Sequence, residues 1–350
     1  MKSTTVLILY AELQGYNIPF FRELSGNFNC DVHVVHWDIK KLTPYVPESI
    51  ENVTYYKKSK FKTKFELNNL VFRLSPELVY ICGWMDFDYL YCARNLVRNK
   101  IPVVAGFDDI YFNSIRQRIA SLVFPLLRSM FFSHAWVSGY YQYEFAKRLG
   151  FRNDSIIYNL LSADVDSFSA AYQSSIELKQ QTYPHNFYFV GRFSEEKGIL
   201  QLLKVWKKLG VRKKDWNIYF VGEGKLKINL LNAGDVNVLE YIHPVDLPKF
   251  VKDFGCFILP SLREPWALVL HEFAAAGIPL IASNVCGAAP FFLIHGFNGF
   301  TFTHSDDSDL ENALLKVINM TDSELFSMSK NSYLLGQRIT PKMSASSFIS

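Results

Sequence analysis

The stretch CFILPSLREPWALVLHEFAAAGIPLIAS, residues 256–283, decides the fold. An apolar run ends at Pro260, a helical pattern follows from about Ala267 to Ala276, and a second apolar run begins at Pro279. Short runs of Ile, Leu, Phe and Val are typical of buried parallel strands, and a helix between two such strands makes a βαβ unit. The stretch therefore predicts a parallel sheet with helices packed against it.

The same rhythm continues along the chain, where apolar runs alternate with longer amphipathic segments. The runs of the first half cover residues 5–10, 31–36, 78–83, 102–107, 135–138 and 155–158. Those of the second half cover residues 186–191, 217–222, 236–242, 256–260, 279–283 and 299–303. We therefore expect an α/β protein with two tandem Rossmann-like, doubly wound parallel-sheet domains and a cleft between them.

A polar stretch near the middle of the chain, rich in Ser, Gln and Ala, lacks any strand pattern and marks the expected domain boundary. Near the end of the chain, Pro341 interrupts a helical pattern. We expect four segments, namely a first domain over 1–165, a linker over 166–184, a second domain over 185–335 and a helix within 336–350 that packs back toward the first domain.

Composition and charge exclude several classes of protein. The formal net charge is +4, and the whole excess lies in residues 1–165. This excess is too small for a nucleic-acid-binding surface, although it suits contact with an anionic membrane or a phosphorylated acceptor. The five cysteines are an odd number without Cys-x-x-Cys spacing, so neither a disulfide framework nor a zinc site is indicated.

The sequence also predicts where the protein works. No run approaches the ~20 apolar residues of a membrane span, and the apolar run at the start is too short for a secretory signal. We expect a cytoplasmic protein, with contact at the inner face of the cytoplasmic membrane as an open hypothesis.

One candidate site is the turn from Gly191 to Gly198, between a strand and a helix. Arg192 and Lys197 flank it and could hold a diphosphate, with further donors from the helix N-terminus. The alternative is a solvated loop in which both cations form surface ion pairs with the neighbouring glutamates.

A second candidate site contains Glu264, in the loop after one strand, and Glu272, inside the following helix. Eight positions are a little over two helical turns, so both carboxylates could face one cleft and accept sugar or ribose hydroxyls. The free amides at the start of this helix could receive a phosphate. The alternative makes Glu264 a helix N-terminal charge and Glu272 a surface residue.

Two glycine turns give weaker signals. Gly222 and Gly224 follow one strand, and Gly15 with Tyr16 follows the first strand of the chain. Both turns would let a ligand approach the backbone closely, although each is equally compatible with a plain tight turn.

Taken together, these motifs resemble the C-terminal domain of the retaining GT-B glycosyltransferases of family 4, also called group 1. The resemblance rests on the turns at 191–198 and 221–224, the Glu-x7-Glu element with Ala-x-Gly-x-Pro at 264–279, and Asn-Gly-Phe at 298–300. It is strong over residues 186–303. In the first half the resemblance is limited to the alternation of apolar runs with amphipathic segments and to residues 155–168.

The resemblance implies transfer of a sugar from a UDP- or GDP-sugar to a glycan or lipid-linked acceptor with retention of configuration and without a metal or other cofactor. The acceptor would bind mainly to the first domain, and the setting would be bacterial surface polysaccharide synthesis. The implied diphosphate ligands are Arg192 and Lys197, whose charge would stabilise the leaving group. The implied donor contacts are Glu264 to the sugar, Glu272 to the ribose, and the backbone at Trp266, Ala267 and Leu268. The glycine turns add Gly15, Gly191 and Gly222 as candidate backbone contacts to the ligand.

The sequence departs from the family pattern at three places, one of which is Glu240, where a Gly is common near the base pocket. Ala267 stands where the family has Gly, and its methyl group narrows the space for the sugar. The family often has a His in the first domain, where this chain has Asp108 and Asp109. Either aspartate could replace that His, and a helix cap is an equally good reading.

Other functions remain open from the sequence alone. Asp86-Phe87-Asp88 and Asp164-Val165-Asp166 fit the Asp-x-Asp pattern of metal-dependent GT-A transferases. A nucleotide-sugar epimerase or a non-catalytic sugar-binding protein could share the fold. Two segments are candidates for membrane contact. Residues 56–65, where Lys alternates with aromatic residues, could instead be a solvated loop. The apolar stretch 116–132 could instead be a buried helix.

Overall fold

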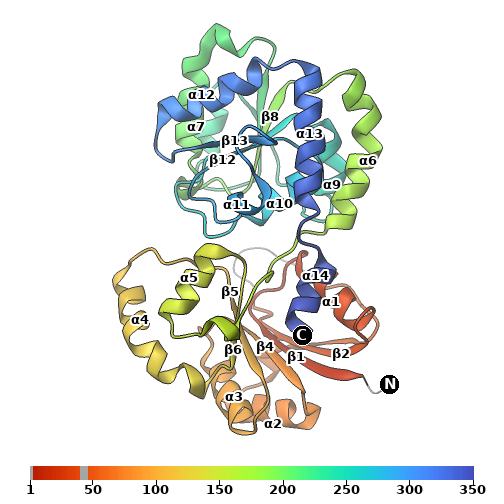
Figure 1. The fold of residues 1–350 in the computed structure, drawn as a ribbon, viewed down its shortest axis with the longest axis vertical. Coiled ribbons are helices and arrows are strands. Elements are labelled where there is room, and N and C mark those ends of the chain that lie inside the picture. Colours follow the sequence, from red (N-terminus) through yellow and green to blue (C-terminus); the bar gives the residue numbers. More distant parts are fainter. Residues whose placement is uncertain (1–2, 40–45) are drawn as a thin grey trace. The chain divides into compact units, whose positions relative to one another are not determined.

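The computed structural model of the protein describes residues 3–39 and 46–350 (Figure 1). The chain divides into two compact units. Unit 1 comprises Met1–Ser162 and Pro341–Ser350, and unit 2 comprises Ala163–Thr340. The chain therefore crosses between the units twice.

Unit 1 contains a seven-stranded parallel sheet in the order β3-β2-β1-β4-β5-β6-β7. Its strands are β1 (Thr4–Tyr10), β2 (Cys30–His36), β3 (Val53–Lys57), β4 (Leu78–Cys82), β5 (Val103–Phe107), β6 (His134–Val137) and β7 (Ile156–Ile157). The strand order reverses between β1 and β4. In open α/β sheets, such a switch point is where ligands bind.

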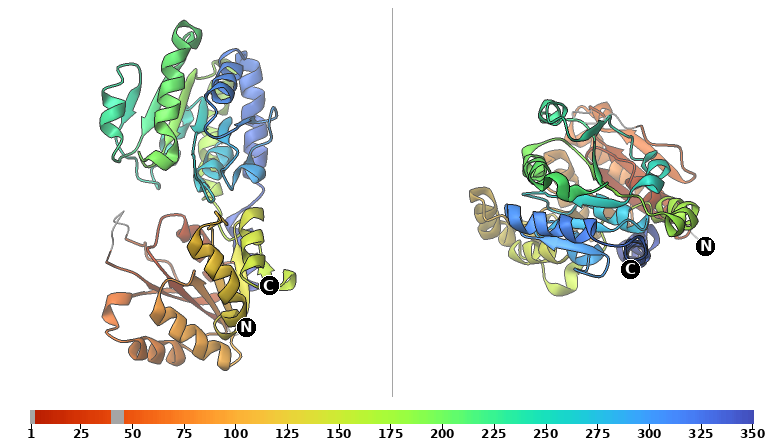
Figure 2. Two further views of the ribbon diagram at one scale, coloured as in Figure 1. Left: turned by 90° about the vertical axis from the view of Figure 1, so that its left-hand side faces the viewer. Right: turned by 90° about the horizontal axis from the view of Figure 1, so that it is seen from above.

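Helices cover both faces of this sheet (Figures 1 and 2). They are α1 (Asn17–Ser25), α2 (Lys64–Leu74), α3 (Phe87–Arg98), α4 (Ile115–Leu127), α5 (Tyr140–Arg148) and α14 (Pro341–Ile349). Alternate residues of β1 enter two separate cores, with Leu7 and Leu9 in one and Val6 and Ile8 in the other. Burial on both faces explains why these strands are continuous apolar runs.

Unit 2 contains a six-stranded parallel sheet in the order β10-β9-β8-β11-β12-β13. Its strands are β8 (Asn186–Val190), β9 (Asn217–Val221), β10 (Asn237–Leu239), β11 (Cys256–Leu259), β12 (Leu280–Ser283) and β13 (Gly299–Phe302). Its helices are α6 (Val165–Gln181), α7 (Ile199–Leu209), α8 (Lys227–Leu231), α9 (Leu247–Phe250), α10 (Leu268–Ala275), α11 (Ala289–Phe292), α12 (Asp307–Ile318) and α13 (Asp322–Gly336). The switch point lies between β8 and β11.

The predicted fold class is confirmed, because both units are Rossmann-like parallel sheets covered by helices. The edge strand β3 was not among the expected strands. Its side chains are half-buried or exposed, so its sequence does not form a continuous apolar run.

The expected linker over 166–184 is instead almost entirely helix α6, which belongs to unit 2 and packs against α10 and α13. The buried residues of α6 are Val165, Phe168, Ala171, Tyr172, Ser175 and Lys179. The apolar stripe therefore covers only the first half of the helix, and polar residues occupy the buried face in the second half. The second unit therefore begins at Ala163, far before the expected residue 185.

The end of the chain forms α14, which returns to unit 1 and packs on α1. The Phe348 ring stacks on Trp136, with ring centres 5.0 Å apart. Within the described residues, none of the helices combines the length and apolar character that crossing a membrane requires.

Candidate functional site

The loops after β8 and β9 are packed tightly against each other. The Phe193 amide donates to the Glu223 carbonyl at 2.8 Å, and the Gly191 amide donates to the Val221 carbonyl at 3.0 Å. A Cβ atom at Gly222 would lie 2.0 Å from the Gly191 carbonyl oxygen, and one at Gly224 would lie 2.4 Å from that of Phe193. Both glycines are therefore needed for the close approach of these loops, whatever else they contact.

The loop after β8 also packs against the end of β11, across the switch point. Gly198 has a positive φ of 68°, and a Cβ atom there would lie 1.8 Å from the Pro260 carbonyl oxygen. The Leu262 amide donates to the Glu196 carbonyl at 2.8 Å. These contacts fix the positions of Arg192, which is exposed, and Lys197, which is half-buried.

Lys197 and Glu264 form an ion pair between these two loops. The pair is mostly buried, with 19% of the Lys197 side chain and 10% of the Glu264 side chain exposed. The Ser261 hydroxyl donates to the same Glu264 oxygen at 3.1 Å. The structure thus unites two residues that the sequence analysis placed in separate motifs, and it adds Ser261.

Glu264 is also held through its backbone. Its carbonyl accepts from the Gly287 amide at 3.1 Å, and the Ser283 hydroxyl donates to the Ser261 carbonyl at 2.6 Å. The loop that carries the carboxylate is therefore tied to the end of β12. A carboxylate held at this many points is preorganised to accept hydroxyl hydrogen bonds in one place.

Helix α10 begins directly after this loop. Its N-cap, Ala267, has φ 78° and ψ 69°, a left-handed conformation that is costly for any residue except glycine. The cap has no side-chain hydrogen bond. The Leu270 amide donates to the Ala267 carbonyl at 3.0 Å, so the amides that this first turn offers to an anion are those of Leu268 and Val269.

Trp266 precedes this helix and is buried against Phe291 and Phe292. Its indole Nε1 has no hydrogen-bond partner within the described part of the chain. Its aromatic contacts hold the backbone that leads into α10.

Glu272 lies half-buried inside α10. Burial, with a smaller effect from the nearby Asp164 carboxylate, raises the pKa of its carboxyl from 4.5 to about 7. Among the described residues, none forms a hydrogen bond or ion pair with this side chain. A carboxylate without a protein partner can still accept hydroxyl groups of a ligand.

The neighbouring His271 is fully buried and was not singled out in the sequence. Its Nδ1 accepts from the Ala163 amide at 3.0 Å, so its Nε2 carries the proton and donates to the Gly336 carbonyl at 2.9 Å. Burial lowers the pKa of this imidazole to about 4. His271 thereby connects α10 to the first residue of unit 2 and to the end of α13.

Three predicted residues belong to unit 1, whereas the cluster described above belongs to unit 2. Gly15 is in the turn before α1, where its carbonyl accepts from the Ile18 amide at 3.1 Å. Asp108 follows β5, and its carbonyl accepts from the Gln142 side chain at 2.9 Å. Asp109 is exposed after the same strand.

The two Asp-x-Asp pairs cap helices. Asp86 caps α3 by accepting from the amides of Asp88 and Tyr89, and it also pairs with Lys58 at 2.9 Å. Asp164 caps α6 by accepting from the Ser167 amide. Across residues 3–39 and 46–350, no three His, Cys, Asp or Glu side chains gather as metal ligands would.

Two tandem Rossmann-like units, with a cationic and an acidic loop meeting at a switch point, define the GT-B class of fold. Residues 175–334 match the model of the family "Glycosyl transferases group 1". This part of the chain, which includes the whole cluster around Lys197 and Glu264, is thus similar to a glycosyltransferase group 1 domain.

Several curated proteins are similar to parts of the chain. An uncharacterised glycosyltransferase of Haemophilus influenzae is 29% identical over 42% of this chain and 43% of its own length. A 41.2 kDa protein in the cps region of Klebsiella pneumoniae is 28% identical over 53% and 50%. The UDP-Gal:alpha-D-GlcNAc-diphosphoundecaprenol alpha-1,3-galactosyltransferase of Escherichia coli is 36% identical over 25% and 21%.

The chain thus spans half or less of the length of these relatives. The similarity of fold extends further. The crystal structure of Anabaena Alr3699/HepE in complex with UDP and glucose has a TM-score of 0.72 at 15% identity, covering 98% of this chain and 97% of that one.

Proposed function

We propose that the protein is a glycosyltransferase that moves a sugar from a nucleoside-diphosphate sugar to a glycan or lipid-linked acceptor, with retention of configuration and without a metal. The observation that carries this proposal is the mostly buried Lys197–Glu264 pair beside the uncapped start of α10. Two charges held together at a switch point, next to free helix amides, suit a ligand that is anionic at one end and rich in hydroxyls at the other.

The roles of the residues follow from their chemistry. Arg192, Lys197 and the first amides of α10 would bind the diphosphate. Glu264, fixed by Ser261, would accept hydroxyls of the donor sugar. Glu272 would accept ribose hydroxyls, in its ionised form.

The reaction breaks the bond between the anomeric carbon and the diphosphate oxygen. The acceptor oxygen forms the new bond to that carbon on the same face, and the acceptor proton leaves with the nucleoside diphosphate. Negative charge develops on the departing oxygen, where Arg192 and Lys197 would stabilise it.

The relatives support the setting of this reaction. The Klebsiella protein lies in a cps region, and the Escherichia coli relative is named for a UDP-sugar donor and a diphosphoundecaprenol acceptor. By analogy we propose a UDP- or GDP-sugar donor and an acceptor used in bacterial surface polysaccharide synthesis, with the protein acting at the cytoplasmic face of the membrane.

Donor binding can be tested by thermal unfolding in the presence of a panel of UDP- and GDP-sugars. A ligand that binds only the folded state at about a hundred times its Kd adds about 2.7 kcal/mol. Arg192→Ala should weaken donor affinity by roughly ten- to a hundredfold, since a hydrogen bond to a charged group contributes about 1.5–3 kcal/mol. The control is Arg212→Ala, in the turn that follows α7. Absence of a shift with every nucleotide sugar contradicts the proposal.

Catalysis needs a separate measurement. Glu264→Gln keeps the shape of the side chain, so donor binding should fall less than transfer, which we expect to drop by roughly a hundredfold. Product analysis must show transfer to an acceptor, since an epimerised nucleotide sugar would indicate the wrong reaction. Activity should persist in EDTA, and its loss there would favour a metal-dependent enzyme.

A further inference from the structure

Helix α4 of unit 1 presents an apolar face to solvent. The exposed side chains on it are Ile115, Ile119, Leu122, Val123, Leu126 and Leu127. Leu122 is 76% exposed and Leu126 is 80% exposed. Residues 115, 119, 122 and 126 follow the helical spacing, so they form one continuous stripe. Contiguous exposed apolar surface of this kind marks an interaction site.

The opposite face of α4 fixes the helix in place. Gln117 is buried, donating to the Ile110 carbonyl at 2.7 Å and accepting from the Phe112 amide at 2.8 Å. Phe124 packs against Trp84 and Phe132. The inward face is thus narrow and partly polar, whereas the larger apolar face points outward, which reverses the usual arrangement of a surface helix.

Along the sequence, the charges on α4 and in its flanking segments all have one sign. No Asp or Glu occurs between Asp109 and Glu144, whereas Arg116 and Arg118 are exposed in the first turns of α4. Cations at a helix N-terminus oppose the helix dipole and destabilise the helix. An anionic surface would compensate both the arginines and the dipole.

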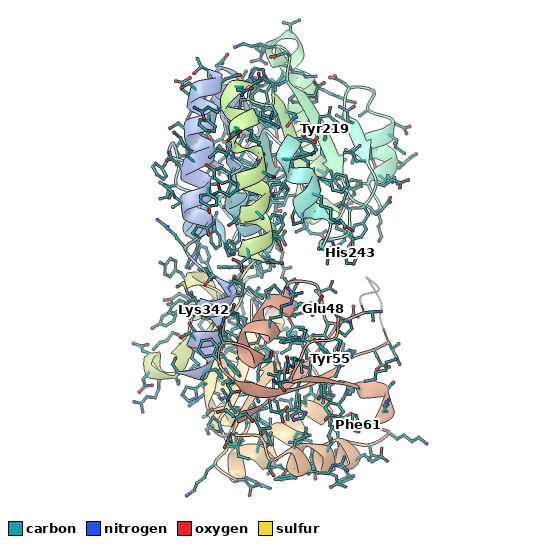
Figure 3. All side chains as sticks on the ribbon, turned by 90° about the vertical axis from the view of Figure 1, so that its right-hand side faces the viewer. Glu48, Tyr55, Phe61, Tyr219, His243 and Lys342 are labelled. Atoms are coloured by element: carbon teal, nitrogen blue, oxygen red, sulfur yellow. The ribbon has the colours of Figure 1, made fainter. Side chains whose placement is uncertain are left out.

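The other candidate segment, residues 56–65, is already engaged within unit 1. Lys58 pairs with Asp86 and Asp88. Lys64 lies over the Tyr91 ring, 4.9 Å from its centre. Phe61, labelled in Figure 3, packs against the core. Among residues 56–65, which the structure describes in full, Phe65 is the one large apolar side chain that is exposed, so this segment offers a membrane less apolar surface than α4 does.

We propose that the outward face of α4 docks the protein on an anionic lipid bilayer, with the apolar stripe in the interface and the arginines at the headgroups. A basic, apolar helix face binds such interfaces. A second copy of the chain is a poorer occupant, because α4 carries no carboxylate that could pair with Arg116 and Arg118 of the other copy. The proposal is independent of the donor site.

The test is flotation of the full chain with vesicles of phosphatidylglycerol and phosphatidylcholine in equal amounts, and with vesicles of phosphatidylcholine alone. The double variant Leu122→Ser, Leu126→Ser should reduce binding to the anionic vesicles by about tenfold or more, because both side chains leave the interface. The matched control is Leu178→Ser, Leu334→Ser, which alters two exposed leucines on helices of unit 2.

Each outcome decides the proposal. Binding to the anionic vesicles that is lost in the α4 variant and kept in the control supports it. Equal flotation of wild type and α4 variant, or no flotation of the wild type, overturns it. A dimer in vesicle-free sedimentation that the α4 variant dissociates also overturns it and assigns the face to a second copy. Thermal shifts with nucleotide sugars should be the same in all three proteins, which separates this result from a failure of the proposed function.

Discussion

At the scale of single residues, Glu272 combines a stability cost with a proposed binding role. The raised pKa means that the folded protein holds a proton on this carboxyl between pH 4.5 and about 7, where the unfolded chain has lost it. The free energy of unfolding is therefore not reduced by this group below pH 4.5. It decreases as the pH rises from 4.5 to about 7 and stays at the lower value above that range.

Glu272→Gln removes this titration. We expect the variant to exceed the wild type in free energy of unfolding by about 1–3 kcal/mol at pH 8, with the difference vanishing near pH 4.5. Urea unfolding at several pH values measures it. If Glu272 binds the ribose, the same variant should bind nucleotide sugars more weakly. A variant that is less stable than the wild type at pH 8 would show that the carboxylate has a favourable partner.

At the scale of one element, the start of α10 carries backbone strain at the place where the donor sugar would lie. Ala267 is left-handed and buried. Ala267→Gly should stabilise unit 2 by about 0.5–1 kcal/mol, because glycine adopts this conformation without steric cost. It also removes a methyl group, so the set of accepted donor sugars should widen.

Ala274→Gly is the matched control, since Ala274 is buried within the same helix in an ordinary helical conformation. There glycine should destabilise the protein by about 1 kcal/mol or more. Thermal unfolding of both variants, with a nucleotide-sugar panel for Ala267→Gly, gives the comparison. If the melting temperatures of the two variants shift in the same direction, the left-handed conformation of Ala267 does not destabilise the folded protein.

The same element shows how far sequence reasoning reaches. Apolar runs predict the strands of unit 2, and the helical pattern from about Ala267 to Ala276 predicts α10, because both depend on local patterns. The Lys197–Glu264 pair needs β8 and β11 to be neighbours, and strand order is not a local property. The roles of Ser261 and His271 depend on tertiary hydrogen bonds, and α6 was missed because its buried face includes Ser175 and Lys179.

At the scale of the whole molecule, unit 1 includes a helix that follows unit 2 in the sequence. α14 belongs to unit 1, although all of unit 2 lies between it and the rest of that unit in the sequence. Phe348 is 2% exposed, stacks on Trp136 and packs edge-on against Tyr80, with ring centres 6.1 Å apart. The core of unit 1 therefore depends on the last residues of the chain.

Phe348→Ala should destabilise unit 1 by about 3–5 kcal/mol, the usual range for removing a buried phenylalanine side chain. Because Phe348 contributes to the core of unit 1, hydrogen exchange measured by mass spectrometry should accelerate in β1 and β2 and stay unchanged in β8 and β9. The thermal shift that nucleotide sugars give to unit 2 should also persist. Equal acceleration of exchange in both sheets would show instead that the units unfold as one cooperative body, so that stability at the donor site depends on the C-terminal helix.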